Sequence, residues 1–244
     1  MKIRLDKFLS NLGLGSRKEV LKLIKSKKIK VNQEIVRDPS FKIDPERDIV
    51  FYENRPFTYQ KYFYYKFYKP KGVITSTKDK DKTIFDLLPS DLPGYKTLFP
   101  AGRLDKDAEG LILLTNDGEL AHRITHPRWK LPKVYEIEIE RPLTDADKLA
   151  IEEGIELKEG KTKPAKISLL NSERTLLEIT VYEGRYHLLK RVFGKLGYKV
   201  LSIKRIAIGP VSLGDLKPCE VRTLSKEELD LLRAQLFREF KDKA

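Results

Sequence analysis

Three carboxylates stand within five positions near the middle of the chain, at Asp105, Asp107 and Glu109. An apolar run, Leu111–Leu114, follows them, so a polar loop is predicted to lead into a buried strand. Carboxylates at this spacing can ligate calcium, act as the acid and base of a glycosidase, or form a solvated acidic turn. Chemistry is therefore sought first in this loop.

Two of these three interpretations are weak. Four residues match positions 1, 3, 5 and 6 of an EF-hand loop: Asp105, Asp107, Glu109 and Gly110. Position 12 falls on Asn116, however, where calcium requires a bidentate Glu. The spacing does not show the separation that a glycosidase pair needs, and a strongly basic chain is an unusual partner for a neutral sugar polymer. A solvated turn, in which Arg103 and Lys106 pair locally, stays open.

Other cofactor motifs are incomplete. His122 and His126 are four residues apart, but Arg123 stands where the helix of a zinc protease has its base. Gly13–Ser16 lacks the six-residue frame of a Walker loop, and no Gly-x-Gly-x-x-Gly opens a helix. We therefore expect no metal and no nucleotide cofactor.

Composition indicates a soluble protein with an anionic partner. The 244 residues include 49 Lys and Arg against 36 Asp and Glu, which gives a net charge of +13. No apolar run approaches the roughly 18 residues of a membrane helix, and the first residues lack the apolar middle of a secretion signal. A cytoplasmic location is expected. The lone Cys219 cannot form an internal disulfide and is predicted to be a small, buried or partly buried side chain.

The amino-terminal residues have the pattern of a small helical unit. Four apolar residues recur at the spacing of one helical face: Leu5, Phe8, Leu9 and Leu12. Ser16 and Glu19 then form a capping box, which predicts the start of a second helix. Alternating residues on either side of Asn32 predict a β-hairpin. The expected order is helix, helix, hairpin.

Cations gather on the second predicted helix, at Arg17, Lys18, Lys22 and Lys25. The first two lie near the helix N-terminus, where the dipole disfavours cations, so either an RNA or DNA partner or a solvated face is expected. Residues 4–9, 15–18 and 29–32 resemble the RNA-binding domain named after small-subunit ribosomal protein S-four. The resemblance covers about residues 1–50 and implies that these four cations meet RNA.

A seam divides this region from the rest. Pro56 restricts its neighbour just after strand-like residues, so we place a linker near 52–60, between a domain at 1–55 and another at 60–235. Beyond the linker the pattern is mixed α+β. Strands are expected at 62–68, 111–115, 134–140 and 175–182, and helices at 119–124, 144–153 and 187–196. The aromatic residues of the first strand alternate in direction, which favours core packing over base stacking.

The second domain resembles a known enzyme family. Residues 102–118 read GRLDKDAEGLILLTNDG, which looks like the central motif of pseudouridine synthases. Further motifs match at 68–72, 133–135 and 183–193, so the resemblance extends over roughly 60–230. With the amino-terminal domain in front, the chain is similar to the RsuA branch, which acts on small-subunit ribosomal RNA. The resemblance implies a mixed, largely antiparallel sheet and isomerisation of uridine to pseudouridine without a cofactor.

By this resemblance, Asp105 is the catalytic aspartate. Tyr135 takes the place of the tyrosine that stacks on the target base, and Lys190 matches the basic residue that pairs with the aspartate. Further RNA contacts are expected from Arg103, Lys133 and Arg185.

The chemistry of the reaction favours the same residues. Isomerising uridine breaks a bond from sugar to nitrogen and makes one from sugar to carbon, so the site needs an ionised carboxylate shielded from water. Burial favours the protonated acid, and a cation at Lys190 would oppose this at Asp105. The target uridine must also leave its stack, at a cost of a few kcal/mol, and stacking on Tyr135 would offset about 1–3 kcal/mol.

The substrate is expected to be ribosomal RNA, free or in a ribonucleoprotein. Tyr186, His187 and the later run Ile208–Pro210 favour the small-subunit branch. A large-subunit synthase and a non-catalytic RNA-binding assembly factor stay open, and a monomer is the default. Two positions depart from the family pattern: Leu188 stands where Gln is more common, and Cys219 where Gly is usual.

Overall fold

The computed structural model describes residues 2–57 and 60–237. The chain divides into two compact units, Met1–Phe63 with Leu88–Leu98, and Tyr64–Leu87 with Phe99–Ala244. The segment Leu88–Leu98 groups with the first unit, although the sequence pattern assigned it to the second domain. Within the described ranges, no helix combines the length and apolar character needed to cross a membrane.

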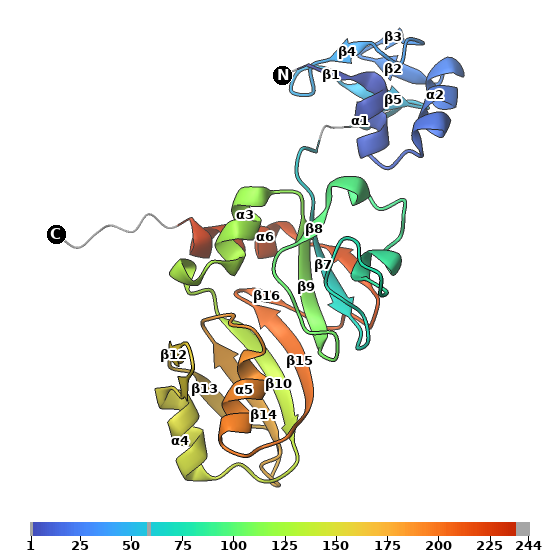
Figure 1. Ribbon diagram of the computed structural model, residues 1–244. Helices are drawn as coiled ribbons and strands as arrows, with labels where there is room; N and C mark the ends of the chain where they lie inside the picture. The colour runs from blue at the N-terminus through green and yellow to red at the C-terminus, as the bar shows by residue number, and fades with distance from the viewer. Residues whose placement is uncertain (1, 58–59, 238–244) are drawn as a thin grey trace, which may run out of the picture. The chain divides into compact units, whose positions relative to one another are not determined.

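The first unit has the predicted order of helix, helix and hairpin (Figure 1). Its elements are β1 (Ile3–Arg4), α1 (Leu5–Asn11), α2 (Arg17–Lys25), β2 (Ile29–Val31), β3 (Glu34–Ile35), β4 (Lys42–Ile43), β5 (Val50–Tyr52), β6 (Arg55–Phe57) and the 3-10 turn η2 (Tyr95–Thr97). Strand β1 pairs with β4, and a second antiparallel sheet has the order β3-β2-β5-β6. The predicted hairpin is β2–β3, with Val31 opposite Glu34.

One apolar core holds these elements together. Its buried members come from both helices, from the strands and from the residue after β3: Leu5, Phe8, Leu9, Val20, Ile24, Ile29, Val31, Val36, Ile43 and Val50. The predicted capping box is present, since the Ser16 hydroxyl accepts from the Glu19 amide and the Glu19 carboxylate accepts from the Ser16 amide. Because the apolar face of α2 is buried, its four cations, Arg17, Lys18, Lys22 and Lys25, lie exposed on the other faces.

The second unit is a mixed α+β fold built on one large sheet. Its elements are β7 (Tyr64–Lys69), η1 (Ile84–Asp86), β8 (Phe99–Pro100), β9 (Glu109–Thr115), α3 (Gly118–Thr125), η3 (Pro127–Trp129), β10 (Lys133–Ile139), α4 (Asp145–Glu153), β11 (Glu156–Leu157), β12 (Gly160–Lys161), β13 (Lys166–Leu169), β14 (Leu176–Val181), α5 (Leu188–Lys195), β15 (Val200–Ile208), β16 (Val211–Ser212), β17 (Val221–Thr223) and α6 (Lys226–Leu236).

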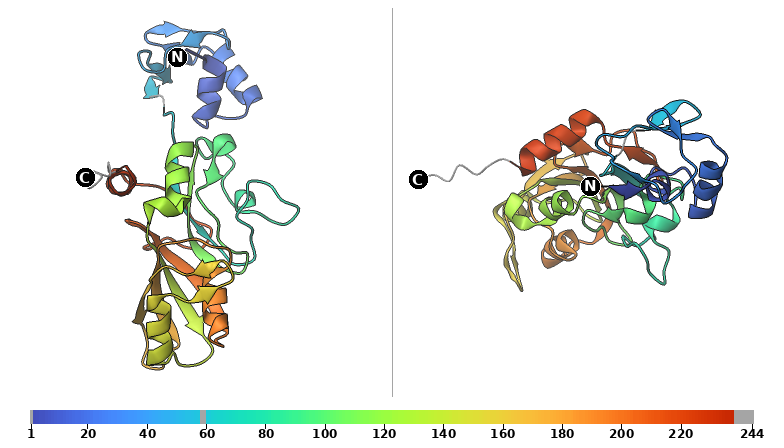
Figure 2. Two further views of the ribbon diagram at one scale, coloured as in Figure 1. Left: turned by 60° about the vertical axis from the view of Figure 1, so that its left-hand side comes forward. Right: turned by 90° about the horizontal axis from the view of Figure 1, so that it is seen from above.

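The sheet brings distant parts of the chain side by side. Its strand order is β13-β14-β10-β15-β9-β7-β17, with β16 beside β15 and β8 beside β9. The pairing of β15 with β9 is parallel, and the others are antiparallel, which confirms the expected largely antiparallel sheet. Helix α5 packs on β15 and α4 on β13, as Figure 1 and Figure 2 show.

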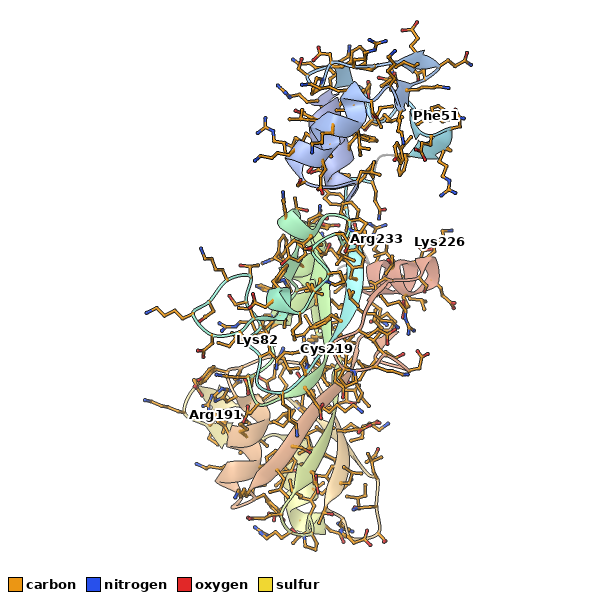
Figure 3. All side chains as sticks on the ribbon, turned by 90° about the vertical axis from the view of Figure 1, so that its right-hand side faces the viewer. Phe51, Lys82, Arg191, Cys219, Lys226 and Arg233 are labelled. Carbon is orange, nitrogen blue, oxygen red and sulfur yellow. The ribbon has the colours of Figure 1, made fainter. Side chains whose placement is uncertain are left out.

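Strand β7 carries the aromatic run, and all six of its residues are buried, which confirms core packing. The strand also contains two buried cations. The Lys66 ammonium lies 2.7 Å from the Glu228 carboxylate and 3.1 Å from the Ser212 carbonyl, so it ties α6 to the sheet. Figure 3 shows α6 with Lys226 and Arg233 labelled.

The prediction of a buried or partly buried thiol is wrong. Cys219 is exposed and lies in the turn before β17, where its amide donates to the Tyr68 carbonyl (2.9 Å) (Figure 3). Its φ is +68°, in the left-handed region that glycine adopts most easily. The turn, and not the core, therefore determines where this side chain goes.

Candidate active site

A pocket of about 150 Å³ opens in the second unit where the loop before β9 meets β10, β15 and the start of α5. A cavity of roughly this volume holds one six-membered ring. Its lining includes all the site residues that the sequence predicted in this unit: Arg103, Asp105, Lys133, Tyr135, Arg185 and Lys190. Residues from four separate parts of the sequence thus surround a space large enough for a base.

The loop that carries Asp105 is fixed from one side by Thr75. The Thr75 hydroxyl donates to the Leu104 carbonyl (2.9 Å) and accepts from the Leu104 amide (3.1 Å). Thr75 is buried, so water does not compete for these bonds. The residue immediately before Asp105 is therefore held by both of its backbone groups.

Lys69, at the end of β7, fixes the loop from the other side. Its ammonium is fully buried and donates to the carbonyls of Pro70 (2.9 Å), Lys106 (3.3 Å) and Ala108 (2.7 Å). Burial lowers the pKa of Lys69 to about 8, because the charged form loses its hydration. This side chain acts as an internal clamp on the backbone around Asp105.

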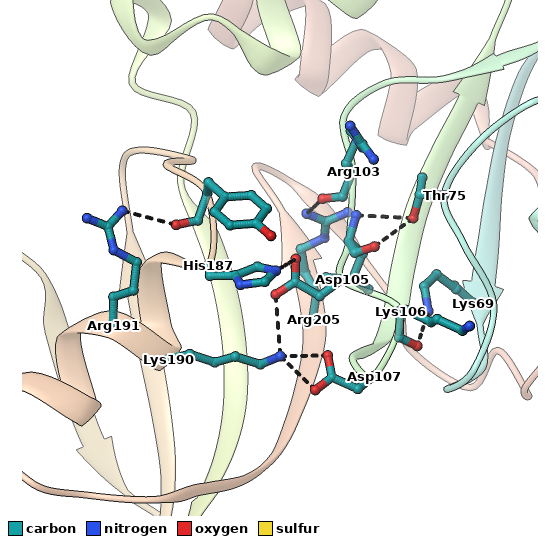
Figure 4. A network of polar contacts seen from close by, with 12 residues as sticks. Lys69, Thr75, Arg103, Asp105, Lys106, Asp107, His187, Lys190, Arg191 and Arg205 are labelled. Atoms are coloured by element: carbon teal, nitrogen blue, oxygen red, sulfur yellow. Dashed lines mark hydrogen bonds and ion pairs between the residues drawn. The ribbon is translucent and has the colours of Figure 1, made fainter. Parts of the chain in front are cut away.

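Asp105 lies between two basic side chains (Figure 4). One carboxylate oxygen is 3.3 Å from His187 Nε2, and the other is 3.8 Å from Lys190 Nζ. The Asp105 side chain is 28% exposed, so the pocket excludes much of the water around it. A carboxylate beside two basic side chains and in reduced contact with water matches the site that the sequence predicts around Asp105.

Lys190 differs from the sequence expectation in its nearest partner. Its ammonium is 2.7 and 2.6 Å from the two oxygens of Asp107, closer than it is to Asp105. The hydrogen bond from Lys190 holds the pKa of the Asp107 carboxyl below its usual value. Lys190 is therefore within ion-pair distance of both aspartates, and its hydrogen bonds go to the more exposed one.

His187 was not singled out as a site residue from the sequence. It precedes α5 with a φ of +49°, which is unusual for a residue with a side chain. The Tyr186 ring, 76% exposed, stacks on the imidazole with centroids 3.7 Å apart. The backbone conformation and the stacked ring together hold His187 against Asp105.

Tyr135 and Arg205 are neighbours across β10 and β15. Arg205 Nη1 is 3.5 Å from the Tyr135 hydroxyl, and the guanidinium lies 5.9 Å from the centre of that ring. Arg205 is only 3% exposed and also lines the pocket. The sequence analysis did not single it out. A signal was present, because Arg205 is two residues from the apolar Ile203 and therefore points to the same face of the strand.

The three cations expected to contact RNA differ in their surroundings. Arg103 is exposed at the edge of the pocket. Burial, with smaller effects from nearby cations, lowers the pKa of Lys133 to about 8. The Arg185 guanidinium already has partners within the protein: it donates to the carbonyls of Gly160 (2.7 Å) and Lys161 (2.9 Å) and pairs with the buried Glu183 (2.7 Å).

In the part of the chain that the structure describes, no group of three or more His, Cys, Asp or Glu side chains is placed to hold a metal ion.

The RNA pseudouridylate synthase family model matches residues 64–195, which include the Asp105 loop, β10 and α5. The chain belongs to this family. In the same synthase, the S4 domain model matches residues 3–49. Both resemblances stated from the sequence are thereby confirmed, and so is the expectation of an RNA-modifying isomerase.

Relatives match the synthase along nearly its whole length. It is 46% identical over 243 residues to an uncharacterized RNA pseudouridine synthase of Aquifex aeolicus (strain VF5), covering 98% of this chain and 95% of that one. It is 39% identical over 234 residues to ribosomal small subunit pseudouridine synthase A of Escherichia coli (strain K12), covering 93% and 98%. A crystal structure of a pseudouridylate synthase matches with a TM-score of 0.66 and 36% identity, covering 94% of this chain and 99% of that one.

Proposed function

We propose that this synthase isomerises a uridine of small-subunit ribosomal RNA, with Asp105 as the group that acts on a flipped-out nucleotide. The observation that carries the proposal is the pocket that Asp105, Tyr135 and Lys190 line together. The small-subunit target is supported by the 39% identity to the Escherichia coli protein of that name, over 93% of this chain.

Asp105 supplies the ionised carboxylate. Lys190 Nζ lies 3.8 Å from one of its oxygens and His187 Nε2 lies 3.3 Å from the other. The bond from the ribose C1′ to N1 of uracil breaks, and a bond from C1′ to C5 forms in its place. The hydrogen on C5 leaves as a proton while N1 gains one, so atoms and electrons balance without a redox group or a metal.

The target base enters the pocket and stacks on Tyr135. Extruding a base costs a few kcal/mol, and a stacking contact worth about 1–3 kcal/mol offsets part of this cost. A pocket of about 150 Å³ is large enough for a single ring. Exposed Arg103, at the edge, is placed to contact a phosphate of the extruded nucleotide.

The RNA around the target is bound through phosphates. The cations Arg17, Lys18, Lys22 and Lys25 are exposed on α2 of the S4 domain. Contacts of this kind give affinity without reading the sequence. In this proposal the first unit supplies binding energy and the second unit supplies chemistry.

The experiment compares tritium release from two RNAs labelled at C5 of uracil, because forming the carbon bond must expel that hydrogen. The full chain is incubated with small-subunit and large-subunit transcripts. Each RNA is supplied both as the naked transcript and as a partly assembled subunit. We expect release from the small-subunit RNA in at least one of these forms. Release from large-subunit RNA alone, or from neither RNA in either form, would contradict the proposed substrate.

A further inference from the structure

Arg205 is a buried cation whose donors are not all used. Its Nε donates to the Leu111 carbonyl at 2.8 Å, but Nη1 makes only long contacts, at 3.4 Å to the Arg103 carbonyl and 3.5 Å to the Tyr135 hydroxyl. Nη2 is buried and has no hydrogen-bond partner among the described residues. Good N–H···O bonds are about 2.7–3.2 Å long, so one edge of this guanidinium is largely unsatisfied.

Such an arrangement is expensive. A guanidinium keeps its charge in proteins, and a buried donor left without an acceptor destabilises the folded chain. Arg205 also has no carboxylate within ion-pair distance among the described residues, whereas Lys190 has Asp107 and Arg185 has Glu183. The unused donors of Arg205 therefore call for an acceptor that arrives with the substrate.

We propose that the Arg205 guanidinium binds a carbonyl oxygen of the target uracil and stabilises the negative charge that the ring gains when its bond to C1′ breaks. The inference rests on the proposed function. The electron pair of the C1′–N1 bond passes to the uracil ring, where O2 and O4 share the charge until C5 bonds to C1′. A fixed cation beside one of these oxygens lowers the energy of that detached ring.

Depth in the pocket favours the base over a phosphate as the ligand. Arg205 is 3% exposed and stands beside the ring of Tyr135, on which the base is proposed to stack. Phosphates stay on the outside of an extruded nucleotide, where exposed Arg103 lies. Nη1 is the donor on the side of Tyr135, its two contacts are 3.4 and 3.5 Å long, and both Arg205 and Tyr135 line the pocket that the base is proposed to enter.

The test uses synthetic RNA fragments that carry the target uridine, or 2-thiouridine or 4-thiouridine in its place. Sulfur accepts hydrogen bonds poorly, so replacing the bound oxygen should slow single-turnover conversion by wild type on the order of tenfold. We call the ratio of the rate on uridine to the rate on a thio analogue the thio penalty. For Arg205→Gln we expect a rate about 10²-fold lower on uridine and a thio penalty close to one. Arg205→Met, which also removes the charge and the donors, serves if the first variant does not fold.

A matched control comes from Lys69→Met, which removes another buried cation that bonds to backbone carbonyls but does not line the pocket. A purely structural loss slows the reaction and leaves the thio penalty at its wild-type size. Loss of the penalty for either analogue in the Arg205 variants, but not in Lys69→Met, supports the inference. Equal penalties in all three proteins for both analogues overturn it, and so does a change confined to RNA affinity and its salt dependence.

The two proposals fail separately. The role of Asp105 is read from the rate of Asp105→Asn on unmodified RNA. The role of Arg205 is read from the ratio of rates on thio and unmodified RNA.

Discussion

Among single residues, Asp105 depends on its neighbours for its position. His187 and Lys190 approach its two oxygens, and Thr75 and Lys69 hold the backbone on either side of it. A preorganised carboxylate of this kind need not reorganise during the reaction. The structure therefore assigns separate tasks to the groups that touch the carboxylate and to the groups that hold its loop.

Lys190→Met tests the cation beside Asp105. Removing the ammonium should lower the single-turnover rate about 10²-fold and leave RNA affinity within about twofold, because the charge acts on the carboxylate. The rate is measured by tritium release and the affinity by titration of labelled RNA. Lys195→Met, an exposed position on the same helix, should change neither. Equal losses of rate and affinity in Lys190→Met would make Lys190 a phosphate contact.

Lys69 predicts a pH dependence of stability. Burial lowers its pKa in the folded protein to about 8 from the usual 10.5, so between these values the unfolded chain binds more protons than the folded one. The free energy of unfolding should therefore rise with pH in this window, by about 2 kcal/mol between pH 8 and 10 for this group. Urea unfolding of wild type and Lys69→Met measures the difference. Identical slopes against pH would show that Lys69 is not a buried cation.

At the scale of elements, the parallel pairing of β9 with β15 places Arg205 beside the Asp105 loop. Gly110 and Arg205 are opposite each other in this pairing, and a Cβ on Gly110 would lie 2.2 Å from the Arg205 carbonyl oxygen. The φ of Gly110 is +113°, which other residues avoid. The close approach of these two backbones therefore requires glycine at position 110.

Gly110→Ala should separate the two strands. We expect the free energy of unfolding to fall by about 3 kcal/mol or more, since backbone must move to admit the methyl group. Gly118→Ala, at the start of α3, meets nothing within 4 Å and should change stability by less than about 1 kcal/mol. Chemical unfolding of both variants tests the pair. A cost for Gly110→Ala as small as that for Gly118→Ala would contradict the strand register.

Local patterns in the sequence were sufficient to predict much of this arrangement. Apolar spacing and a capping box predicted α1 and α2, and the run 102–118 predicted the loop with Asp105. His187 was missed because its position depends on an unusual φ, which the spacing of residues does not reveal. Arg205 was missed because it reaches the site through the pairing of β15 with β9, two strands far apart in the chain. Lys190 was found, but its bonds to Asp107 depend on side-chain geometry that spacing does not contain.

In the whole molecule, a net charge of +13 accompanies two compact units, for which we propose different tasks. On this proposal, the four exposed cations of α2 contribute to RNA binding through release of counterions, and the pocket around Asp105 contributes the chemistry. Affinity and turnover should therefore respond to different sets of substitutions.

Replacing Arg17, Lys18, Lys22 and Lys25 by Gln tests this division. The slope of log affinity against log salt should become shallower by roughly 0.7–0.9 for each phosphate that these cations no longer neutralise, and the rate of the bound complex should be unchanged. A control with the same change in net charge replaces four exposed lysines of the second unit by Gln: Lys158, Lys166, Lys217 and Lys226. An equal change of slope in both variants would show that the α2 cations form a solvated surface and make no specific contact with RNA phosphates.

The most direct test of the account is the single-turnover tritium release of Asp105→Asn beside wild type, with RNA affinity measured on the same proteins. Asn keeps the shape of the side chain and removes the charge that the reaction uses. We expect release to be abolished while affinity stays within about twofold of wild type. Near-normal release by Asp105→Asn would contradict it, because the pocket around Asp105 would then not be where uridine is isomerised.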